Sequence, residues 1–466
     1  MLRCAVTENG KVSGLPADDP RVTVFRGIPF AAPPVGENRW RAPQRAENWD
    51  GVRKCHEFAP ICMQDRPAVG DDIYCREFHV DPDIPISEDS LYLNIWTDAK
   101  SADEKKPVLL WIYGGAFQWG YTAEMEFNGE RIARHGIVVV SAAYRLGVFG
   151  FLAHPDLTAQ DGRHPSNFGL LDQQAALSWV YRNVAAFGGD PGNITLAGQS
   201  AGGASVSYAM GFSGNSEMIR KATVFSGFIR NPFGFDGIIQ PKTIEESEEN
   251  GKDFIACLGC SSVDEARTVG AETVRDAYFE YAKDHPRFVP CIDHEYVKND
   301  PYVMFLNGSM PDIPIFTGYT KDEFTESVPK NADTDPSKIR ARIFEKSGRR
   351  MINIIENSVR LIADAHDKYD KKAPMYVYRF APSVPGWDDP GVFHSCDLWF
   401  FFETLQKCWR PFDGRHYDLA KRMCDSWCNF LKTGDPNGEG YDGRMLPEWK
   451  PCDKTSDMFE AEFTDR

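Results

Sequence analysis

The segment around Ser200 joins a hydroxyl nucleophile to a backbone able to expose it. Gly198 and Gly202 flank the serine, and the apolar run 193–197 comes directly before them. The glycines predict a sharp turn from a strand into a helix, because a β-carbon at either flank would collide with neighbouring backbone. Ser200 would stand exposed at that turn, with the amide of Ala201 pointing at an oxyanion. The alternative is an ordinary Gly/Ser loop, but the preceding strand and the small-residue helix start favour the turn.

A serine hydroxyl is a weak nucleophile at neutral pH, so it needs a base within hydrogen-bond reach and an acid to orient that base. The histidines that follow Ser200 are His285, His294, His366, His394 and His416. Of these, His394 stands between the loop 387–391 and the aromatic run 397–402, so a loop would present it beside a buried helix. We predict that His394 is the base. The alternative for this residue is a buried core histidine.

The acid is expected after a strand that lies between Ser200 and His394 in the chain. The apolar run 313–317 predicts such a strand, and it leads to Asp322 and Glu323. Either carboxylate could accept a hydrogen bond from the imidazole and stabilise the imidazolium. Spacing alone does not separate them, and the one that is not used is expected to be a solvated helix cap.

A second glycine-rich turn would complete the reaction centre. Gly114, Gly115 and Ala116 follow a strand predicted at 108–113, and their small size lets backbone amides approach a ligand closely. The amides of Gly115 and Ala116, together with that of Ala201, would supply three hydrogen-bond donors to a tetrahedral intermediate. The alternative is a plain turn that ends a strand.

The elements that position these residues are short apolar runs alternating with helical patterns. The runs cover 91–96, 108–113, 137–143, 194–198, 223–225, 313–317 and 375–380. Several are continuously apolar, which indicates strands buried on both faces in a mostly parallel sheet covered by helices. Residues 4–7 and 11–13 flank an Asn-Gly pair, a hairpin signal that predicts an antiparallel edge and so a mixed sheet. A long helix from near Asn167 to the turn 187–191 would lay an apolar face on the sheet.

The chain has 466 residues, 42% of them hydrophobic, and no Gly/Ser-rich linker, acidic block or internal repeat divides it. We therefore expect a single α/β domain over 1–466. Charged helical patterns predominate at about 230–310 and 335–370. We expect these insertions to cap the carboxyl edge of the sheet and to frame a pocket there, where open α/β sheets bind ligands.

The net charge of −16 disfavours a nucleic-acid or anionic-membrane surface, where clustered Lys and Arg would be needed. The chain has no apolar leader and no stretch of membrane-spanning length, so we expect a cytoplasmic protein. Its 12 cysteines are scattered, and most are expected to be buried thiols. Cys257 and Cys260 lack the second pair of a zinc site, while Cys424 and Cys428 share a helix face and should pack in the core.

These segments together resemble the type-B carboxylesterase family of α/β-hydrolases, which includes bacterial p-nitrobenzyl esterases and animal cholinesterases. The resemblance runs almost end to end and is carried by 25–31, 88–96, 113–117, 167–173, 198–203, 321–323 and 427–437. It implies an α/β-hydrolase fold over the whole chain. It also implies a triad of Ser200, Glu323 and His394, with Gly115, Ala116 and Ala201 as the oxyanion hole.

Departures from the family pattern bear on the substrate and the compartment. Gln199 stands where the family often has a glutamate, so one negative charge beside the site is missing. No tryptophan lies between Cys62 and Ser90 to form the aromatic platform that binds a quaternary ammonium, so a choline ester is not expected. Secreted relatives pair a cysteine like Cys62 with one at the position of Ser90. Serine cannot form that bridge, which favours a reducing compartment. At the position of Ala116 the sequence resembles the bacterial members of the family.

The resemblance also covers Arg145 and Asp172, which match charged positions that are structural in the family. We expect a buried ion pair that holds the long helix against the sheet.

The resemblance and the residues together imply a serine carboxylic-ester hydrolase that works through an acyl-enzyme without metal or cofactor. We expect a small-molecule ester with a short or medium acyl group, or an aromatic ester, as substrate, and a monomer or weak homodimer. The expected substrate-binding residues are Phe117, Trp119, Gln199 and Trp399. Alternatives are a hydroxycinnamoyl esterase, an amidase, a lactone hydrolase or a non-catalytic binding protein; retention of all three triad residues argues against the last.

Overall fold

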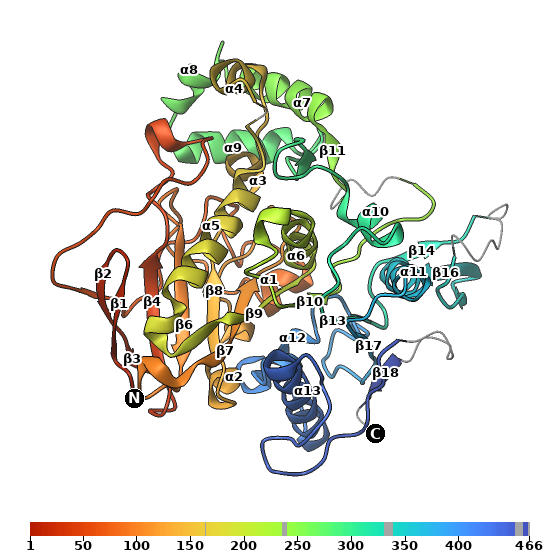
Figure 1. Ribbon diagram of the computed structural model, residues 1–466. Helices are drawn as coiled ribbons and strands as arrows, with labels where there is room; N and C mark the ends of the chain where they lie inside the picture. The colour runs from red at the N-terminus through yellow and green to blue at the C-terminus, as the bar shows by residue number, and fades with distance from the viewer. Residues whose placement is uncertain (164, 235–239, 330–338, 453–459, 465–466) are drawn as a thin grey trace.

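The structure is a computed structural model that describes residues 1–163, 165–234, 240–329, 339–452 and 460–464 (Figure 1). In this part of the chain a ten-stranded sheet has the order β18-β17-β13-β10-β9-β7-β8-β6-β4-β3. Its strands are β3 (Leu15–Pro16), β4 (Thr23–Pro29), β6 (Tyr92–Thr97), β7 (Lys106–Ile112), β8 (Val138–Ala142), β9 (Gly189–Gln199), β10 (Lys221–Phe225), β13 (Ile315–Thr320), β17 (Met375–Phe380) and β18 (Glu460–Phe463). All seven predicted apolar runs form strands of this sheet, so the predicted fold class is confirmed.

The sheet is mixed, as expected. The strands from β8 to β18 are parallel, whereas β3, β4 and β6 pair antiparallel at the other end. The central strands are apolar because both of their faces are covered; all five residues of β8 are buried.

The predicted N-terminal hairpin is present, but it is not an edge of this sheet. β1 (Cys4–Thr7) and β2 (Gly10–Ser13) pair antiparallel and join β5 (Val52–Lys54) in a separate three-stranded sheet. Side chains of β1 alternate between exposed and buried, so the strand has only one face to bury. It therefore lies beside the central sheet, and β3 with β4 supplies the antiparallel edge.

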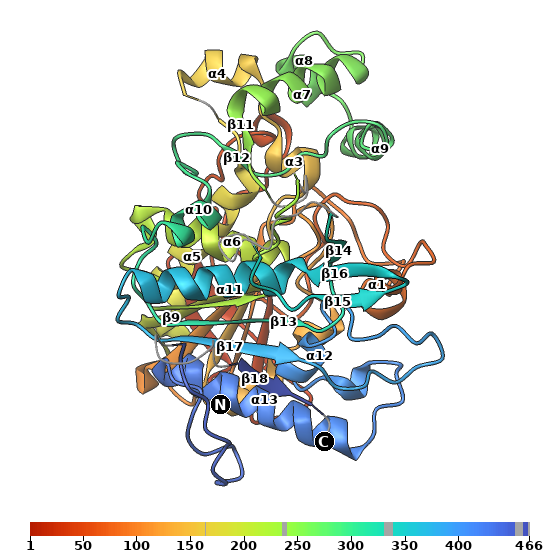
Figure 2. The same cartoon turned by 90° about the vertical axis from the view of Figure 1, so that its right-hand side faces the viewer.

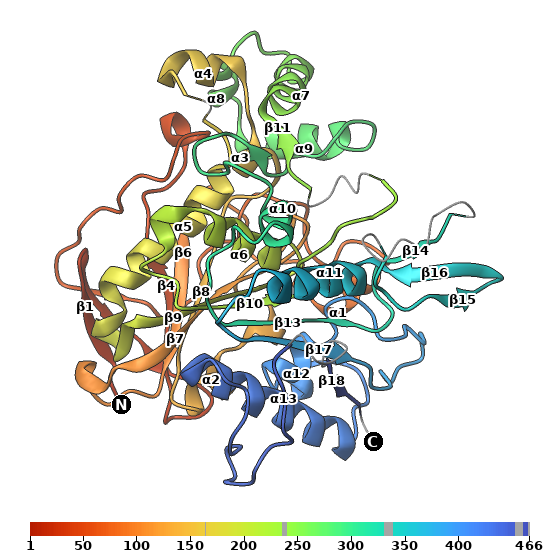
Figure 3. The ribbon, with the colours of Figure 1, turned by 45° about the vertical axis from the view of Figure 1, so that its right-hand side comes forward.

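Helices cover both faces of the sheet (Figures 2 and 3). One layer contains α5 (Phe168–Asn183), α6 (Ala201–Gly211), α10 (Pro301–Leu306) and α11 (Ile354–Lys368), and the opposite layer contains α2 (Glu130–Arg134), α12 (Leu398–Phe401) and α13 (Gly414–Thr433). The predicted long helix is α5. A 3-10 turn and Gly188, with φ of +83°, end it, and β9 begins at once. None of the described helices is both long and apolar enough to cross a membrane.

Arg145 and Asp172 form the expected buried ion pair. The guanidinium donates to the carboxylate from Nε at 2.8 Å and from Nη2 at 2.7 Å, and the backbone amide of Arg145 adds a third bond at 3.0 Å. Burial raises the pKa of Asp172, and the guanidinium opposes that rise. The pair ties α5 to the segment that follows β8.

The two insertions differ from each other. Within 230–310 the chain forms α7 (Ile244–Cys257), α8 (Val263–Arg267), α9 (Ala271–Tyr281) and α10, with residues 235–239 outside the described part. The insertion at 335–370 was predicted to be helical, and this is wrong for its first half; residues 335–338 lie outside the described part. There β15 (Phe344–Lys346) and β16 (Arg349–Asn353) form an antiparallel sheet with β14 (Thr325–Ser327).

The hairpin between β15 and β16 was missed because the residues next to its turn, 344–346 and 349–350, are solvent-exposed and mostly charged. Ser347 and Gly348 connect them with φ of 52° and 72°, the paired positive angles of a two-residue hairpin turn.

All 12 cysteines are free thiols, and six of them are buried. The prediction that most are buried is therefore only half right. Cys62 donates a hydrogen bond from its thiol to the carbonyl of Tyr144 at 2.8 Å. Cys424 and Cys428 lie buried on one face of α13, with their Sγ atoms 3.9 Å apart, as expected of core packing.

Candidate active site

Ser200 lies at the junction of β9 and α6, where the predicted turn is present. The residue has φ of 55° and ψ of −124°, a conformation that side chains rarely adopt. A β-carbon on Gly198 would lie 2.4 Å from backbone atoms of Gly202, and one on Gly202 would lie 2.1 Å from the carbonyl oxygen of Ile112. Both glycines are therefore required. The backbone amide of Ser200 donates to Phe225 O at 2.9 Å, which anchors the turn to the next strand.

His394 is brought to Glu323. The imidazole Nδ1 is hydrogen-bonded to Oε2 of the glutamate, and both side chains are buried. The other carboxylate oxygen, Oε1, accepts hydrogen bonds from Ser226 Oγ at 2.8 Å and from the amide of Thr320 at 2.7 Å. These two donors hold the carboxylate in place, facing the histidine.

Asp322, the other candidate acid, has a different part in the structure. Its side chain accepts a hydrogen bond from the amide of Val392 at 2.9 Å, and its own amide donates to the carbonyl of Val392 at 3.0 Å. Asp322 thus clamps the loop that ends in His394. It is exposed, as expected of the unused carboxylate, but it caps no helix.

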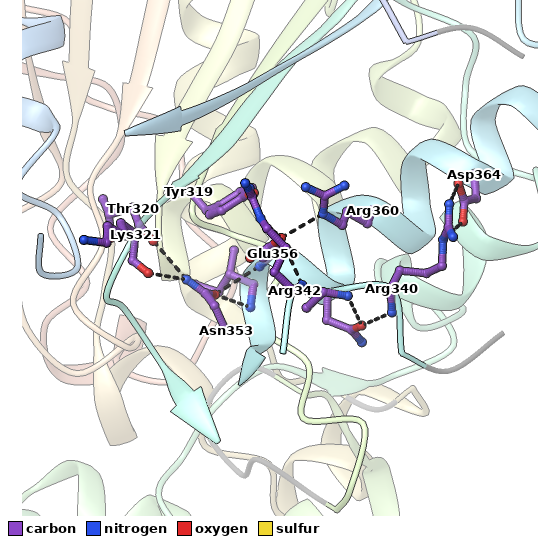
Figure 4. A network of polar contacts seen from close by, with 12 residues as sticks. Tyr319, Thr320, Lys321, Arg340, Arg342, Asn353, Glu356, Arg360 and Asp364 are labelled. Carbon is purple, nitrogen blue, oxygen red and sulfur yellow. Dashed lines mark hydrogen bonds and ion pairs between the residues drawn. The ribbon is translucent and has the colours of Figure 1, made fainter. Parts of the chain in front are cut away.

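The turn that carries Glu323 is held from α11 (Figure 4). Asn353 donates from its side-chain amide to the carbonyl oxygen of Thr320 at 2.9 Å, and its Oδ1 accepts from the first amides of α11. Arg342 donates to Glu356 at 2.8 Å and to the hydroxyl of Tyr319 at 2.8 Å. The second insertion therefore fixes the end of β13, a role that sequence reasoning missed because it depends on contacts between distant residues.

Gln199 contacts the candidate base. Its side-chain nitrogen lies 3.1 Å from Nε2 of His394 and donates to Ser395 Oγ at 2.8 Å. Since the Nδ1 side faces a carboxylate, Nε2 is the acceptor in the neutral ring. In this arrangement the side-chain amide of Gln199 donates to the lone pair of Nε2 that would accept a proton from a serine.

Three backbone amides at the site are available to an oxyanion. Gly115 and Ala116 have φ of 96° and 53° in the loop after β7, and Ala201 is the first residue of α6. Within the described residues, none of these three amides has a hydrogen-bond acceptor. Free N–H groups next to a nucleophile are suited to stabilise a developing negative charge.

A cavity of about 440 Å³ contains this chemistry. Ser200, His394, Gly115, Ala116, Gln199 and Trp119 line it. Two residues expected in the substrate pocket do not reach its wall. Phe117 is buried against Phe151, with ring centroids 5.2 Å apart, and Trp399 is buried and stacks on Phe78 at 5.8 Å. Both therefore belong to the core and not to the cavity wall.

The predicted frame of the pocket is also wrong. No described residue of 230–310 or 335–370 lines the cavity, whereas 64–79, which includes α1 (Ile73–Glu77), supplies much of its wall. Phe279 of α9 instead stacks on Trp119 at 6.3 Å, so the first insertion supports the wall. Sequence reasoning missed 64–79 because a five-residue helix is too short to show a periodicity.

In the part of the chain that the structure describes, one group of His and Cys side chains could hold a metal ion. The ligand atoms of His135, Cys424 and Cys428 lie within 4.8 Å of one another. However, Nε2 of His135 is 2.7 Å from Oδ1 of Asp425, and Nδ1 is 2.9 Å from the carbonyl oxygen of Arg131. Both ring nitrogens therefore already have partners.

Comparisons with known proteins identify the family of the chain. The model of the carboxylesterase family matches residues 3–357 and 337–465. Para-nitrobenzyl esterase of Bacillus subtilis is 30% identical over 93% of this chain and 90% of its own length, and bovine carboxylesterase 4A is 29% identical over 96% and 88%. A thermophilic PNB esterase structure aligns with a TM-score of 0.79 at 27% identity, over 100% of this chain and 97% of that one. The chain therefore belongs to the carboxylesterase family and is a carboxylic-ester hydrolase of the α/β-hydrolase fold.

Proposed function

We propose that the protein hydrolyses carboxylic esters through an acyl-enzyme formed on Ser200, with His394 as general base and Glu323 as its orienting acid. The observation that carries the proposal is the buried His394–Glu323 pair beside a serine held in a strained turn. Backbone strain and buried ionisable pairs of this kind are typical of active sites, where the surrounding structure maintains them.

The reaction has two halves. Ser200 Oγ attacks the ester carbonyl carbon while Nε2 of His394 accepts the hydroxyl proton, and Glu323 stabilises the imidazolium. The carbonyl oxygen becomes an oxyanion that accepts from the amides of Gly115, Ala116 and Ala201. On collapse the C–O bond breaks and the alcohol leaves with the proton from Nε2. Water then attacks the acyl-enzyme by the same steps, which releases the acid and restores Ser200.

A small-molecule ester with a short or medium acyl group is the proposed substrate, and an aromatic, hydroxycinnamoyl-type ester is the alternative. The cavity of about 440 Å³ suits a small molecule, and the apolar part of its wall includes Tyr74, Phe78, Trp119 and Phe324. The name of the para-nitrobenzyl esterase relative also points to small esters. The mechanism needs neither metal nor cofactor.

We further infer that the chain acts as a single domain, as a cytoplasmic monomer or weak homodimer of bacterial-like type. One continuous hydrophobic core runs from Ala5 to Trp449, which supports a single domain. The free thiols support a reducing compartment, and Ala116 supports the bacterial likeness. Light scattering coupled to size-exclusion chromatography would contradict the oligomeric inference if it gave a stable tetramer.

The test is the hydrolysis of p-nitrophenyl esters of increasing acyl length by wild type, Ser200→Ala and Ser207→Ala. Ser207 is a matched control because it is a buried serine of the same helix that donates to the carbonyl of Gly203. We expect turnover with a length optimum in wild type and Ser207→Ala, and none above background in Ser200→Ala. Turnover that survives in Ser200→Ala, or a folded wild type inactive on every length, would overturn the proposal.

A further inference from the structure

Two buried carboxylates, Glu124 and Glu126, line the same cavity as Ser200. The side chains belong to the segment between the oxyanion loop and α2, and they are 6% and 1% exposed. The mechanism proposed above uses neither of them. Burying an acid that takes no part in the reaction costs folding free energy. The hydrogen-bond partners of each acid therefore indicate its role.

Glu124 is partly satisfied. Its Oε1 accepts a hydrogen bond from the amide of Tyr121 at 2.7 Å, and its Oε2 lies 3.6 Å from Nε2 of His79. Glu126 is also only partly satisfied: its carboxyl group is hydrogen-bonded to that of Glu124, but within the described residues its Oε2 is buried and has no hydrogen-bond partner. Such buried acceptors are rare in native proteins, and one at the wall of a cavity points to a donor that arrives with the ligand.

The electrostatics of the pair agree with this interpretation. Burial, and then the charge of Glu124, raise the pKa of Glu126 well above its usual range. Burial and the neighbouring acid thus disfavour the charged form of Glu126. A ligand cation beside the pair would favour that charged form and would offer it hydrogen-bond donors.

Charged residues elsewhere on the cavity wall do not compensate the two acids. Asp65 and Asp72 add negative charge, and Arg66 is exposed and donates from Nη1 to the carbonyl of Pro82 at 2.8 Å. His79 already faces Glu124. The field in the cavity thus favours a positively charged group.

We propose that the active-site cavity takes esters whose acyl or alcohol part ends in a primary or secondary ammonium, which donates to Glu126 and Glu124. The inference rests on the proposed function and adds a substrate class to it. An ammonium with N–H donors fits because carboxylate oxygens only accept. A trimethylammonium has no N–H to donate and would leave Oε2 of Glu126 unpartnered.

The experiment compares isosteric substrates in pairs at about pH 7.5, where alkylammonium groups stay charged. The acyl pair is p-nitrophenyl 6-aminohexanoate against p-nitrophenyl heptanoate, and the alcohol pair is 5-aminopentyl butyrate against hexyl butyrate. The readout is the ratio of kcat/KM within each pair. Because both members meet the same enzyme, a general loss of activity in a variant cancels. Ser200→Ala supplies the non-enzymatic blank.

We expect wild type to favour the ammonium ester in one of the two pairs by about tenfold or more. Glu126→Gln should bring that ratio close to one. Asp65→Asn is the matched control, because it removes a charge at an exposed position of the same wall, and it should change the ratio by no more than about twofold. A ratio in Glu126→Gln equal to that of wild type would overturn the proposal.

Inhibition of wild type keeps the inference testable should Glu126→Gln fail to fold. Hexylammonium should compete with p-nitrophenyl butyrate at concentrations about tenfold lower than those of 1-hexanol and of hexyltrimethylammonium. Equal inhibition by all three would contradict the ammonium site. Hydrolysis of neutral esters without preference in either pair would also refute it and leave the serine esterase intact, whereas no hydrolysis of any ester would refute the proposed function itself.

Discussion

The side-chain nitrogen of Gln199 lies 3.1 Å from Nε2 of His394. In the mechanism proposed above, Nε2 is the atom that receives the proton of Ser200. That mechanism therefore requires the Gln199 amide to move away from Nε2 before Ser200 can donate to it.

Gln199→Glu should shift the acid limb of the pH profile of kcat/KM upward by about one pH unit. A carboxylate beside Nε2 stabilises the imidazolium, so His394 stays protonated to higher pH, and only its neutral form can act as base. Gln199→Met is the control of similar size without charge, and it should leave the limb in place. If Gln199→Glu and wild type had the same acid limb, the side chain at position 199 would not influence His394.

Glu323→Gln should lower kcat/KM about a thousandfold or more, because an amide can neither hold the Nδ1 proton in the same way nor stabilise the imidazolium. Asp322→Asn should cost about tenfold or less, since the asparagine oxygen can still accept from the amide of Val392. Steady-state kinetics on one p-nitrophenyl ester measures both. The assignment of the acid is wrong if Asp322→Asn is the more damaging change.

Asp172→Ala should reduce the free energy of unfolding by about 3–5 kcal/mol, because the buried guanidinium of Arg145 loses its partner. Urea denaturation provides the measurement. Glu37→Ala breaks an exposed pair with Arg41 and should cost less than about 1 kcal/mol. Equal costs for the two variants would show that the buried pair does not hold α5 against the sheet.

The stability of the protein should depend on pH through Asp397. This residue is buried, and its Oδ2 accepts a hydrogen bond from the hydroxyl of Tyr378 at 2.6 Å. Burial, with a smaller contribution from Glu323, raises the pKa of Asp397 to about 7. Between about pH 4 and pH 7 the folded state thus binds more protons than the unfolded state, so this residue's contribution to stability falls as the pH rises.

Asp397→Asn removes this titration and keeps an acceptor for Tyr378. The melting temperature of the variant relative to wild type should therefore be higher at pH 8 than at pH 5. Melting curves at both pH values measure the difference, and other titrating groups cancel in the comparison. A difference between variant and wild type that is the same at both pH values would refute the prediction.

Sequence predicted those parts of the molecule that local sterics and burial decide. The continuous apolar residues of 138–140 need both faces covered, which is enough to place β8 inside a parallel sheet. The glycines around Ser200 are required because a β-carbon at either position would lie 2.1 to 2.4 Å from neighbouring backbone atoms. The residue types alone therefore predict the turn. The type and order of the main elements follow from such features.

Tertiary contacts decide what sequence could not. Asp322 and Glu323 are adjacent, and only the donors from Ser226 and Thr320 and the contact with His394 distinguish them in space. Aromatic residues are equally compatible with core and cavity, which is why Trp399 was misassigned. The carboxylates of Glu124 and Glu126 gave no periodic signal, and their importance appears only with their burial.

Covalent labelling shows whether Ser200 is the nucleophile. A fluorophosphonate reacts with a serine that is activated by a base, and the mass of the intact protein reports the adduct. We predict one adduct per chain, mapped by peptide sequencing to Ser200, slowed by an ester substrate and absent from Ser200→Ala. An adduct on another residue, or no adduct on folded wild type that hydrolyses esters, would contradict the account.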